Sequence, residues 1–333
     1  MKIFFDTIGC RLNQSEIEMF ARQFRSAGHT VVSDPAEADY VVVNTCAVTA
    51  EAVSDSRHKI RQAARATRGE IVATGCWATL DAKNASSLTG VTRVVPNLAK
   101  DRLVADLLNL PVEVFDIEPI AREPLPGAHL RTRAFIKVQD GCDNHCTFCV
   151  TRLARGAGRS RTVAQIKGDV RAALEGGAQE VVLTGVHLGS WGQDFTPPAR
   201  LADLVAALLR DPDLPRLRLS SLEPWDLDEA FFELWRDPRL CRHLHLPLQS
   251  GSAEILRRMA RKTTPETFAR LVEAARAVSP DMAITTDLIA GFPGETEEDF
   301  QMLLDFLKEA QLDRVGCFKY SPVEGATANE LAD

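Results

Sequence analysis

The chain has 333 residues, of which 45% are hydrophobic and 26% are charged, and its net charge is −7. Such a composition is typical of a globular protein, and the length allows two domains. The acidic balance argues against a surface that binds nucleic acid everywhere, although it allows a local basic patch. No apolar run approaches the ~20 residues of a membrane-spanning helix, and the start turns acidic at Asp6, too early for a signal peptide. We therefore expect a cytoplasmic protein.

The first 110 residues alternate between strand and helix patterns. Apolar runs typical of strands occupy residues 2–5, 29–32, 40–44, 70–74 and 92–95. Between them, apolar residues recur at the spacing of amphipathic helices. Alternating strands and helices predict an α/β fold with a doubly wound parallel sheet covered on both faces. We assign residues 1–110 to this domain.

A linker is expected at residues 111–132. It contains Pro111, Pro119, Pro124, Pro126 and Gly127, which disfavour regular structure. Residues 112–115 are expected to add a short strand.

Residues 133–333 repeat the alternation six times. The expected strands are residues 134–138, 180–184, 216–220, 243–248, 282–289 and 314–320. Six strand–helix units predict a (βα)6 partial TIM barrel, shorter than the eight units of a closed one.

Three cysteines follow the first barrel strand at short spacing: Cys142, Cys146 and Cys149. One tight loop can present such thiolates to a single metal centre, and three ligands leave a fourth position open. Three buried structural cysteines, a disulfide, or a zinc site that includes His145 are the alternatives.

Three further cysteines are far apart in the sequence, but each follows a predicted strand of the first domain. They are Cys10, Cys46 and Cys76. Ligand sites of parallel sheets lie past the carboxyl ends of the strands, so we expect a second metal site there, with ordinary buried cysteines as the alternative. Neighbouring polar groups are expected to donate hydrogen bonds to its sulfurs; these are Asn13, Gln14, Thr45, Thr74 and Gly75.

A basic run follows Cys149. Arg152, Arg155, Arg159 and Arg161 lie within ten residues of an otherwise acidic chain, which favours a phosphate-facing patch over a solvated surface. A second basic group, residues 257–262, is equally consistent with a solvated helix end.

These motifs resemble those of a known family. The Cys-x3-Cys-x2-Cys loop, with Phe148 before its last cysteine, resembles the radical S-adenosylmethionine (SAM) enzymes. The chain also resembles one family within that group, the methylthiotransferases, and this resemblance covers essentially its whole length. The motifs that carry it, besides the loop, are Gly9-Cys10-Arg11-Leu12-Asn13-Gln14, Asn44-Thr45-Cys46 and Thr74-Gly75-Cys76.

The resemblance implies two [4Fe-4S] clusters and SAM as cofactors. Cys142, Cys146 and Cys149 would hold the cluster that cleaves SAM, and Cys10, Cys46 and Cys76 an auxiliary cluster whose sulfur accepts a methyl group. The 5′-deoxyadenosyl radical would then remove the hydrogen at carbon 2 of an adenine, where the methylthio group is delivered. The implied SAM contacts are Phe148, Thr184, Gly185, Ser220, Glu223, Gln249, Asp287 and Gly291.

Within the family, the motifs look most like those of the bacterial tRNA N6-threonylcarbamoyladenosine methylthiotransferases. Relatives that act on isopentenyladenosine in tRNA or on a ribosomal-protein aspartate are alternatives, and a non-catalytic zinc-stapled RNA-binding module is an alternative of another class. The implied partners are the tRNA anticodon stem-loop, an electron donor such as flavodoxin or ferredoxin, and a sulfur source. Asn13, Arg152, Arg155, Arg159 and Arg161 would contact the substrate.

The end of the sequence departs from the family pattern. Family members usually continue past the barrel into a small β-barrel RNA-binding domain, whereas this sequence ends at Asp333. Either the sequence is part of a longer chain, or the barrel and the arginine run bind tRNA alone.

Overall fold

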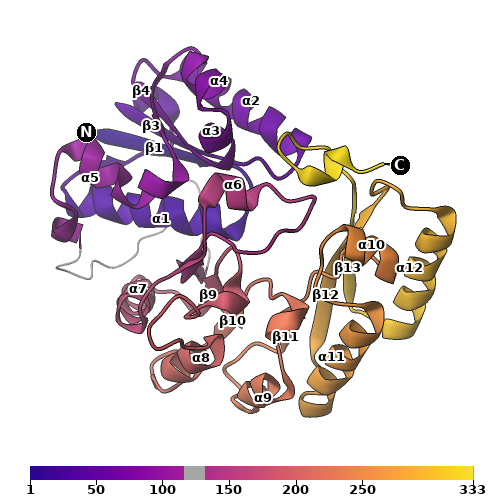
Figure 1. Cartoon of the computed structure of the whole chain (residues 1–333). Coiled ribbons are helices and arrows are strands. Elements are labelled where there is room, and N and C mark those ends of the chain that lie inside the picture. Colours follow the sequence, from indigo (N-terminus) through magenta and orange to yellow (C-terminus); the bar gives the residue numbers. More distant parts are fainter. Residues whose placement is uncertain (116–131, 333) are drawn as a thin grey trace. The chain divides into compact units, whose positions relative to one another are not determined.

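A computed structural model describes residues 1–115 and 132–332 (Figure 1). The chain forms two compact units: the first contains residues 1–137, 150–156 and 164–181, and the second contains the others. Most of the predicted linker lies outside the described residues. Its beginning, Val112–Phe115, is a short 3-10 helix rather than the expected strand. The predicted domain limits at residues 110 and 133 stay predictions.

The first unit is built on a five-stranded sheet in the order β2-β1-β3-β4-β5. The strand pairs are all parallel, as the sequence predicts. This order reverses direction between β1 and β3, the switch point where doubly wound sheets bind their ligands. The strands are β1 (Lys2–Thr7), β2 (Thr30–Val31), β3 (Tyr40–Thr45), β4 (Glu70–Gly75) and β5 (Val91–Val95).

Helices cover both faces of this sheet (Figure 1). Val42 of β3 packs with Phe20 of α1 on one face, whereas Val41 and Val43 pack with Ile60 of α2 on the other. Consecutive strand residues point to opposite faces, so a strand buried on both sides is apolar throughout. The helices are α1 (Arg11–Ser26), α2 (Ala50–Ala66), α3 (Cys76–Leu80), α4 (Ala82–Ser87) and α5 (Leu103–Leu108).

Two later segments also belong to the first unit. Helix α6 (Thr151–Arg155) places Ala154 in the same apolar core as Trp77 of α3. Helix α7 (Val163–Glu175) is tied to α1 by an ion pair between Arg22 and Asp169, with N and O atoms 3.1 Å apart.

The barrel strands overlap the predicted ranges, although β11 (His243–His245) ends at His245 and not at residue 248 as predicted. The strands β6 (Arg133–Lys137), β9 (Glu180–Thr184) and β10 (Leu217–Leu219) form one sheet in the order β10-β9-β6. A second sheet has the order β11-β12-β13 and consists of His243–His245, Ala283–Ala290 and Arg314–Lys319. A parallel bridge between Ser221 and His245 joins the end of β10 to β11, so six strands follow one another as a partial barrel predicts. A small antiparallel pair is formed by β7 (Gln139–Asp140) and β8 (Arg159–Ser160).

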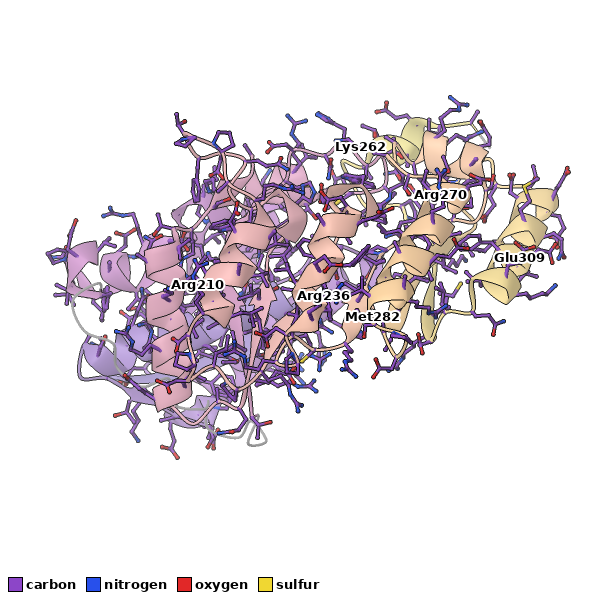
Figure 2. The ribbon with its side chains drawn as sticks, turned by 90° about the horizontal axis from the view of Figure 1, so that it is seen from below. Arg210, Arg236, Lys262, Arg270, Met282 and Glu309 are labelled. Carbon is purple, nitrogen blue, oxygen red and sulfur yellow. The ribbon has the colours of Figure 1, made fainter. Side chains whose placement is uncertain are left out.

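The outer layer of the second unit is helical. Its helices are α8 (Leu201–Leu209), α9 (Glu229–Phe232), α10 (Ala253–Arg258), α11 (Pro265–Val278) and α12 (Glu297–Ala310). Figure 2 shows the row of helices with Arg210 at the end of α8, Arg270 on α11 and Glu309 on α12. The α/β class is thus confirmed. Within the described residues, no helix has the length and apolar character needed to cross a membrane.

Candidate metal centres

Cys10, Cys46 and Cys76, the first cysteine triad, lie at the carboxyl ends of three adjacent strands. Cys10 caps the start of α1 after β1, Cys46 follows β3, and Cys76 begins α3 after β4. Gly9 shows how tightly the chain is folded here: a Cβ atom on it would stand 2.7 Å from Cys46 Sγ. The topology therefore gathers at the switch point three cysteines that are distant in the sequence.

The thiols of this triad influence one another. Burial raises the pKa of Cys46 to about 11, and the neighbouring Cys10 and Cys76 thiols add to the rise. All three cysteines are free of disulfides. Because a metal binds the thiolate form, metal binding at Cys46 must release a proton that the free thiol holds at neutral pH.

Two asparagines contact the sulfurs of the triad. The Cys10 thiol donates to Asn13 Oδ1 at 3.8 Å, and Asn97 Nδ2 donates to Cys76 Sγ at 3.7 Å. The other side chains expected to donate to sulfur have different acceptors. The hydroxyls of Thr45 and Thr74 donate to backbone carbonyls, and the Gln14 amide donates to Glu18.

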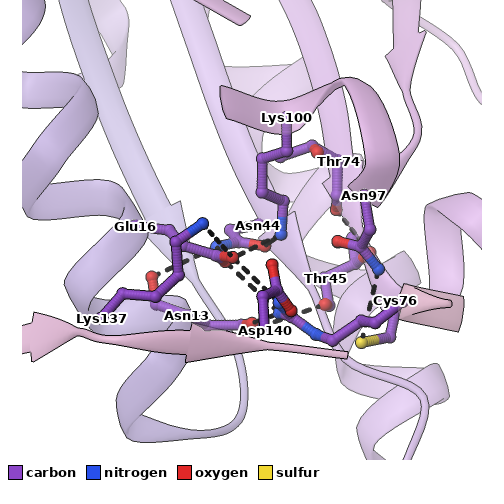
Figure 3. A network of polar contacts seen from close by, with 12 residues as sticks. Asn13, Glu16, Asn44, Thr45, Thr74, Cys76, Asn97, Lys100, Lys137 and Asp140 are labelled. Carbon is purple, nitrogen blue, oxygen red and sulfur yellow. Dashed lines mark hydrogen bonds and ion pairs between the residues drawn. The ribbon is translucent and has the colours of Figure 1, made fainter. Parts of the chain in front are cut away.

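Behind the triad lies a buried ion network, which we define as Glu16, Lys100, Lys137 and Arg155. Figure 3 shows Glu16, Lys100 and Lys137, together with the buried carboxylate of Asp140. Glu16 Oε2 lies 2.8 Å from Lys100 Nζ, and Glu16 Oε1 lies 2.9 Å from Arg155 and 3.8 Å from Lys137 Nζ. Burial alone would raise the pKa of Glu16, but the three cations outweigh it and hold that pKa well below its usual value.

This network corrects two expectations about substrate contacts. Arg155 is only 1% exposed and donates to Glu16 and to Asn13 Oδ1, so it does not face a phosphate. Asn13 is also 1% exposed, and its amide donates to the carbonyls of Ile8 and Thr45. Both residues instead support the loop that carries Cys10.

Cys142, Cys146 and Cys149, the second cysteine triad, come from one loop after β7. The Cys149 N–H donates to the Cys146 carbonyl at 3.1 Å and closes a turn between them. Thr147 anchors that turn, because its N–H donates to the Met259 carbonyl and its hydroxyl to the Arg258 carbonyl. These three cysteines are also free of disulfides.

A histidine–aspartate pair stands beside Cys142. His187 Nε2 lies 2.6 Å from Asp226 Oδ2, and Asn144 Nδ2 lies 3.3 Å from His187 Nδ1. Burial alone would lower the pKa of His187, but hydrogen bonds to Asp226 and Cys142 raise it to about 10. His187 thus contacts both Asp226 and Cys142.

An arginine stands beside Cys146. Arg261 donates to Cys146 Sγ at 3.8 Å and to Glu223 Oε2 at 2.7 Å, and its guanidinium lies 4.4 Å from the centre of the Trp225 ring. Burial raises the pKa of Cys146 to about 11, and the charge of Arg261 opposes that rise. Arg261 belongs to the second basic group, residues 257–262. Because Arg261 is buried, it is not part of a solvated helix end.

Four of the expected SAM contacts lie where strands β9 and β10 end. Thr184 is buried at the end of β9, and Gly185 leaves room for Gln139, whose Oε1 would meet a Cβ there at 3.0 Å. Ser220 Oγ is buried and has no hydrogen-bond partner among the described residues. Glu223 holds Arg261, as described above.

The other four lie on the far strands or in the cysteine loop. Gln249 has the unusual φ of 81°, and Gly291 has a φ of 72°. Asp287 Oδ2 lies 3.3 Å from His245 Nε2 on the neighbouring strand, and Phe148 packs against a core that contains Met259. Their role in binding SAM stays a prediction.

The remaining arginines of the basic run are accessible. Arg152 and Arg159 are exposed and Arg161 is half-buried. Arg159 also lies 3.7 Å from Asp140. Three of the four arginines thus remain candidates for phosphate contacts.

The donor sets suit iron–sulfur clusters. Each triad offers three thiols that form no disulfide and have hydrogen-bond donors beside them. The buried Ser220 hydroxyl, near the end of β10, has no hydrogen-bond partner among the described residues and could bind a polar atom of SAM. Across residues 1–115 and 132–332, no group of three His, Cys, Asp or Glu side chains is close enough together to hold a single metal ion. A four-iron cluster takes thiols that stand further apart, because each binds a different iron.

Sequence reasoning missed several residues of these sites. Glu16 gave a signal, since a carboxylate on the apolar face of a helix, beside Ile17 and Phe20, is unusual unless it is paired. His187 lies two residues after Gly185, one of the expected SAM contacts, but a single histidine in a turn does not indicate its partner. Lys100, Asp226 and Asn97 carried no sequence signal, because their partners are distant in the chain.

Comparisons with known proteins agree with this geometry. Residues 136–307 match the family described as the radical SAM superfamily, and residues 2–96 match the uncharacterized protein family UPF0004. The chain therefore belongs to the radical SAM superfamily.

Relatives narrow the assignment. The Thermotoga maritima threonylcarbamoyladenosine tRNA methylthiotransferase is 39% identical over 98% of this chain and 76% of its own length. The Bacillus subtilis enzyme of the same name is 35% identical over 99% of this chain and 75% of its own. A Klebsiella pneumoniae ribosomal protein uS12 methylthiotransferase is 32% identical over 100% of this chain and 77% of its own. The protein is a radical SAM methylthiotransferase, which confirms the predicted family and excludes a non-catalytic module.

Solved structures support the fold. The radical SAM methyltransferase TsrM from Kitasatospora setae covers 96% of this chain with a TM-score of 0.70 and 17% identity, over 76% of its own length. At that identity the likeness concerns the fold alone.

Proposed function

We propose that this methylthiotransferase acts on N6-threonylcarbamoyladenosine in tRNA and adds the methylthio group at carbon 2 of the adenine. The observation that carries the proposal is the pair of separate free-cysteine triads, one at the sheet switch point and one in the loop of the barrel. The substrate is supported by the Thermotoga and Bacillus relatives, whose names state that tRNA nucleoside.

In this proposal each triad holds one [4Fe-4S] cluster, and the second triad leaves one iron open for SAM. When bound, the clusters and SAM supply one-electron cleavage of SAM and a sulfur that carries the transferred methyl group. The chain's own residues hold these groups in place.

The residues around the second triad orient its loop. His187, fixed by Asp226, stands at Cys142, and Arg261, fixed by Glu223, stands at Cys146. Such outer contacts fix the direction of the ligand sulfurs and balance their negative charge. The free hydroxyl of Ser220 at the same rim suits a ribose or carboxylate oxygen of SAM.

The substrate would be held through its backbone and an exposed base. Arg152, Arg159 and Arg161 suit phosphate oxygens, since a guanidinium binds phosphate through paired hydrogen bonds. Bases of a single-stranded loop can be turned out and bound at their edges, which makes an anticodon-loop adenosine a suitable target.

The test is mass spectrometry of tRNA nucleosides from a strain that lacks this gene. The expected result is loss of the methylthio form of N6-threonylcarbamoyladenosine and its return with the wild-type chain but not with Cys46→Ala. Unchanged levels would overturn the proposal.

A second candidate substrate is an aspartate of ribosomal protein uS12, favoured by the Klebsiella relative. The same strain separates the two candidates. A uS12 peptide that loses its methylthio group, with unchanged tRNA, would select the protein substrate.

A further inference from the structure

A second histidine–aspartate pair lies in the β11-β12-β13 sheet of the second unit. His245 of β11 and Asp287 of β12 stand on adjacent strands, with Nε2 and Oδ2 3.3 Å apart. The other ring nitrogen of His245, Nδ1, lies 2.9 Å from the hydroxyl of Thr285. Because both ring nitrogens have a polar contact, the imidazole is held in one orientation, and it holds the carboxylate beside it.

These side chains lie on the inner face of the sheet. Consecutive strand residues point to opposite faces. Leu244, Ile284 and Leu288, which alternate with the polar residues, are at most 1% exposed, so theirs is the face that the outer helices cover. The side chain of Asp287, by contrast, is 38% exposed. Its carboxylate is therefore accessible from the inner side of the partial barrel.

The neighbouring strand leaves room for this carboxylate. Gly316 of β13 is the register partner of Asp287, and a Cβ atom on Gly316 would stand 2.6 Å from Asp287 Oδ1. That distance is shorter than any van der Waals contact between non-bonded atoms. An ionised carboxylate offers about four acceptor positions, and the contact with His245 uses one of them. The group can therefore accept hydrogen bonds from a ligand.

The same face leads to the second cysteine triad. Ile289, two residues beyond Asp287, points to the same side and packs against an apolar core that Phe148, next to Cys149, also contacts. Two strand residues span about 7 Å, so Asp287 lies one such step further from the cysteine loop than Ile289. The carboxylate thus lies close to the strand ends where SAM is expected, but further inside the barrel.

A carboxylate restricts the chemistry of what can bind beside it. It accepts hydrogen bonds from N–H and O–H groups and repels another carboxylate. Each carbon of an aspartate side chain is part of its carboxylate or bonded to it, so a reacting aspartate would bring a like charge towards Asp287. In N6-threonylcarbamoyladenosine the carboxylate is many bonds away from carbon 2, and the nucleoside carries several N–H and O–H donors. The charge of Asp287 therefore favours the nucleoside.

We propose that Asp287 is a specificity-determining residue that accepts a hydrogen bond from an N–H or O–H group of the target nucleoside. His245 acts through Asp287 and is a positioning residue. This inference rests on the proposed function, because it takes a tRNA nucleoside as the substrate and places the reacting carbon beside SAM at the strand ends. It gives Asp287 a role different from the SAM contact that the family resemblance implies.

The test is steady-state kinetics of the reconstituted full chain on an anticodon stem-loop that carries N6-threonylcarbamoyladenosine. Asp287→Ala should lower kcat/KM for the stem-loop about 10- to 100-fold, the usual effect of losing a hydrogen bond to a charged group. Asp287→Asn keeps an acceptor oxygen and should lose less. The KM for SAM, and SAM cleavage in the absence of RNA, should stay at the parent values.

Gly316→Ala is an independent variant, because its methyl group would displace the Asp287 carboxylate without removing it from the chain. It should lower kcat/KM for the stem-loop in the same way. The matched control is Asp305→Asn on α12, which removes an exposed carboxylate that pairs with Lys308; no change is expected. Equal iron content in all variants excludes a general loss of folding as the cause.

A raised KM for SAM with unchanged kinetics on the stem-loop would overturn the inference and make Asp287 a SAM contact. Unchanged kinetics in both Asp287→Ala and Gly316→Ala would overturn it as well. The parent chain tests the proposed function separately. Failure of the parent to modify the stem-loop would overturn that function, whereas normal turnover by the parent and by both variants would overturn the inference alone.

Discussion

The two cysteine sites are assembled in opposite ways. The first triad comes from three strand ends that span 67 residues of sequence, whereas the second comes from one eight-residue loop. The first depends on the order of a whole sheet, and the second depends on a turn and its anchors at Thr147. A site assembled by topology is as rigid as its sheet, and a site on a loop needs its own supporting contacts.

Their charged surroundings differ as well. A shared network of buried ions lies behind the first triad, while the second has an individual partner for each of two cysteines, His187 at Cys142 and Arg261 at Cys146. Substitutions should therefore act on the first site as a unit and on the second site sulfur by sulfur.

The largest expected effect separates the two sites by activity. Cys149→Ala should reduce SAM cleavage to background, because the second triad loses a ligand, whereas Cys46→Ala should leave SAM cleavage intact and abolish methylthiolation. Both are measured anaerobically by the release of 5′-deoxyadenosine and of modified nucleoside. Loss of both activities in Cys46→Ala would show that the sites do not have separate roles.

The next effect concerns stability. Glu16→Ala leaves the buried cations of its network without their carboxylate, so it should lower the free energy of unfolding by about 3–5 kcal/mol. The control Glu37→Ala breaks a surface pair with Lys2 and should cost less than about 1 kcal/mol. Urea unfolding of the cluster-free chain measures both losses of free energy. If Glu16→Ala costs as little as Glu37→Ala, the ion pairs of the buried network do not contribute to stability as a unit.

A smaller effect concerns single sulfurs of the second site. Arg261→Met removes the donor to Cys146, and loss of such an outer contact typically lowers metal affinity or activity about 10–100-fold. Iron bound per chain and the rate of SAM cleavage are the measurements. Lys262→Met is the matched control, since Lys262 also lies over Trp225, with its Nζ 6.0 Å from the ring centre. Equal losses in both variants would show that the contact with the Trp225 ring, and not the hydrogen bond to Cys146, is what matters.

The smallest effect concerns the arginine run. Arg152→Gln with Arg159→Gln should weaken binding of an anticodon stem-loop and reduce the salt dependence by about 1 unit of log–log slope per phosphate contact. SAM cleavage should be unchanged. Arg257→Gln on α10 is the control, and a slope that stays constant in the double variant would remove these arginines from the RNA contacts.

Much of this architecture could be predicted from the sequence, because strands, helices and the loop triad are local patterns. The position of the first triad followed from a topological rule applied to predicted strands. Strand β11 ends at His245 rather than at residue 248, and Pro247, which has no N–H to donate to a ladder, lies in the missing part.

The partners of buried charges could not be predicted. Arg155 appeared as one of four surface arginines, but its carboxylate, Glu16, lies 139 residues earlier. His187 and Asp226 are 39 residues apart. Which distant charges meet depends on how the chain folds, and a single sequence does not encode that in any local pattern.

The helix α6 ties the folding of the first unit to a later part of the chain. Its residues follow Cys149 directly, yet Ala154 completes the core beside Trp77, and Arg155 supplies a partner of Glu16. On the ribosome, where N-terminal domains generally fold first, this N-terminal unit lacks α6 until residue 155 has left the exit tunnel, and it lacks residues 164–181 for longer still. Glu16 therefore gains that partner only after all six cysteines of the two triads have been made.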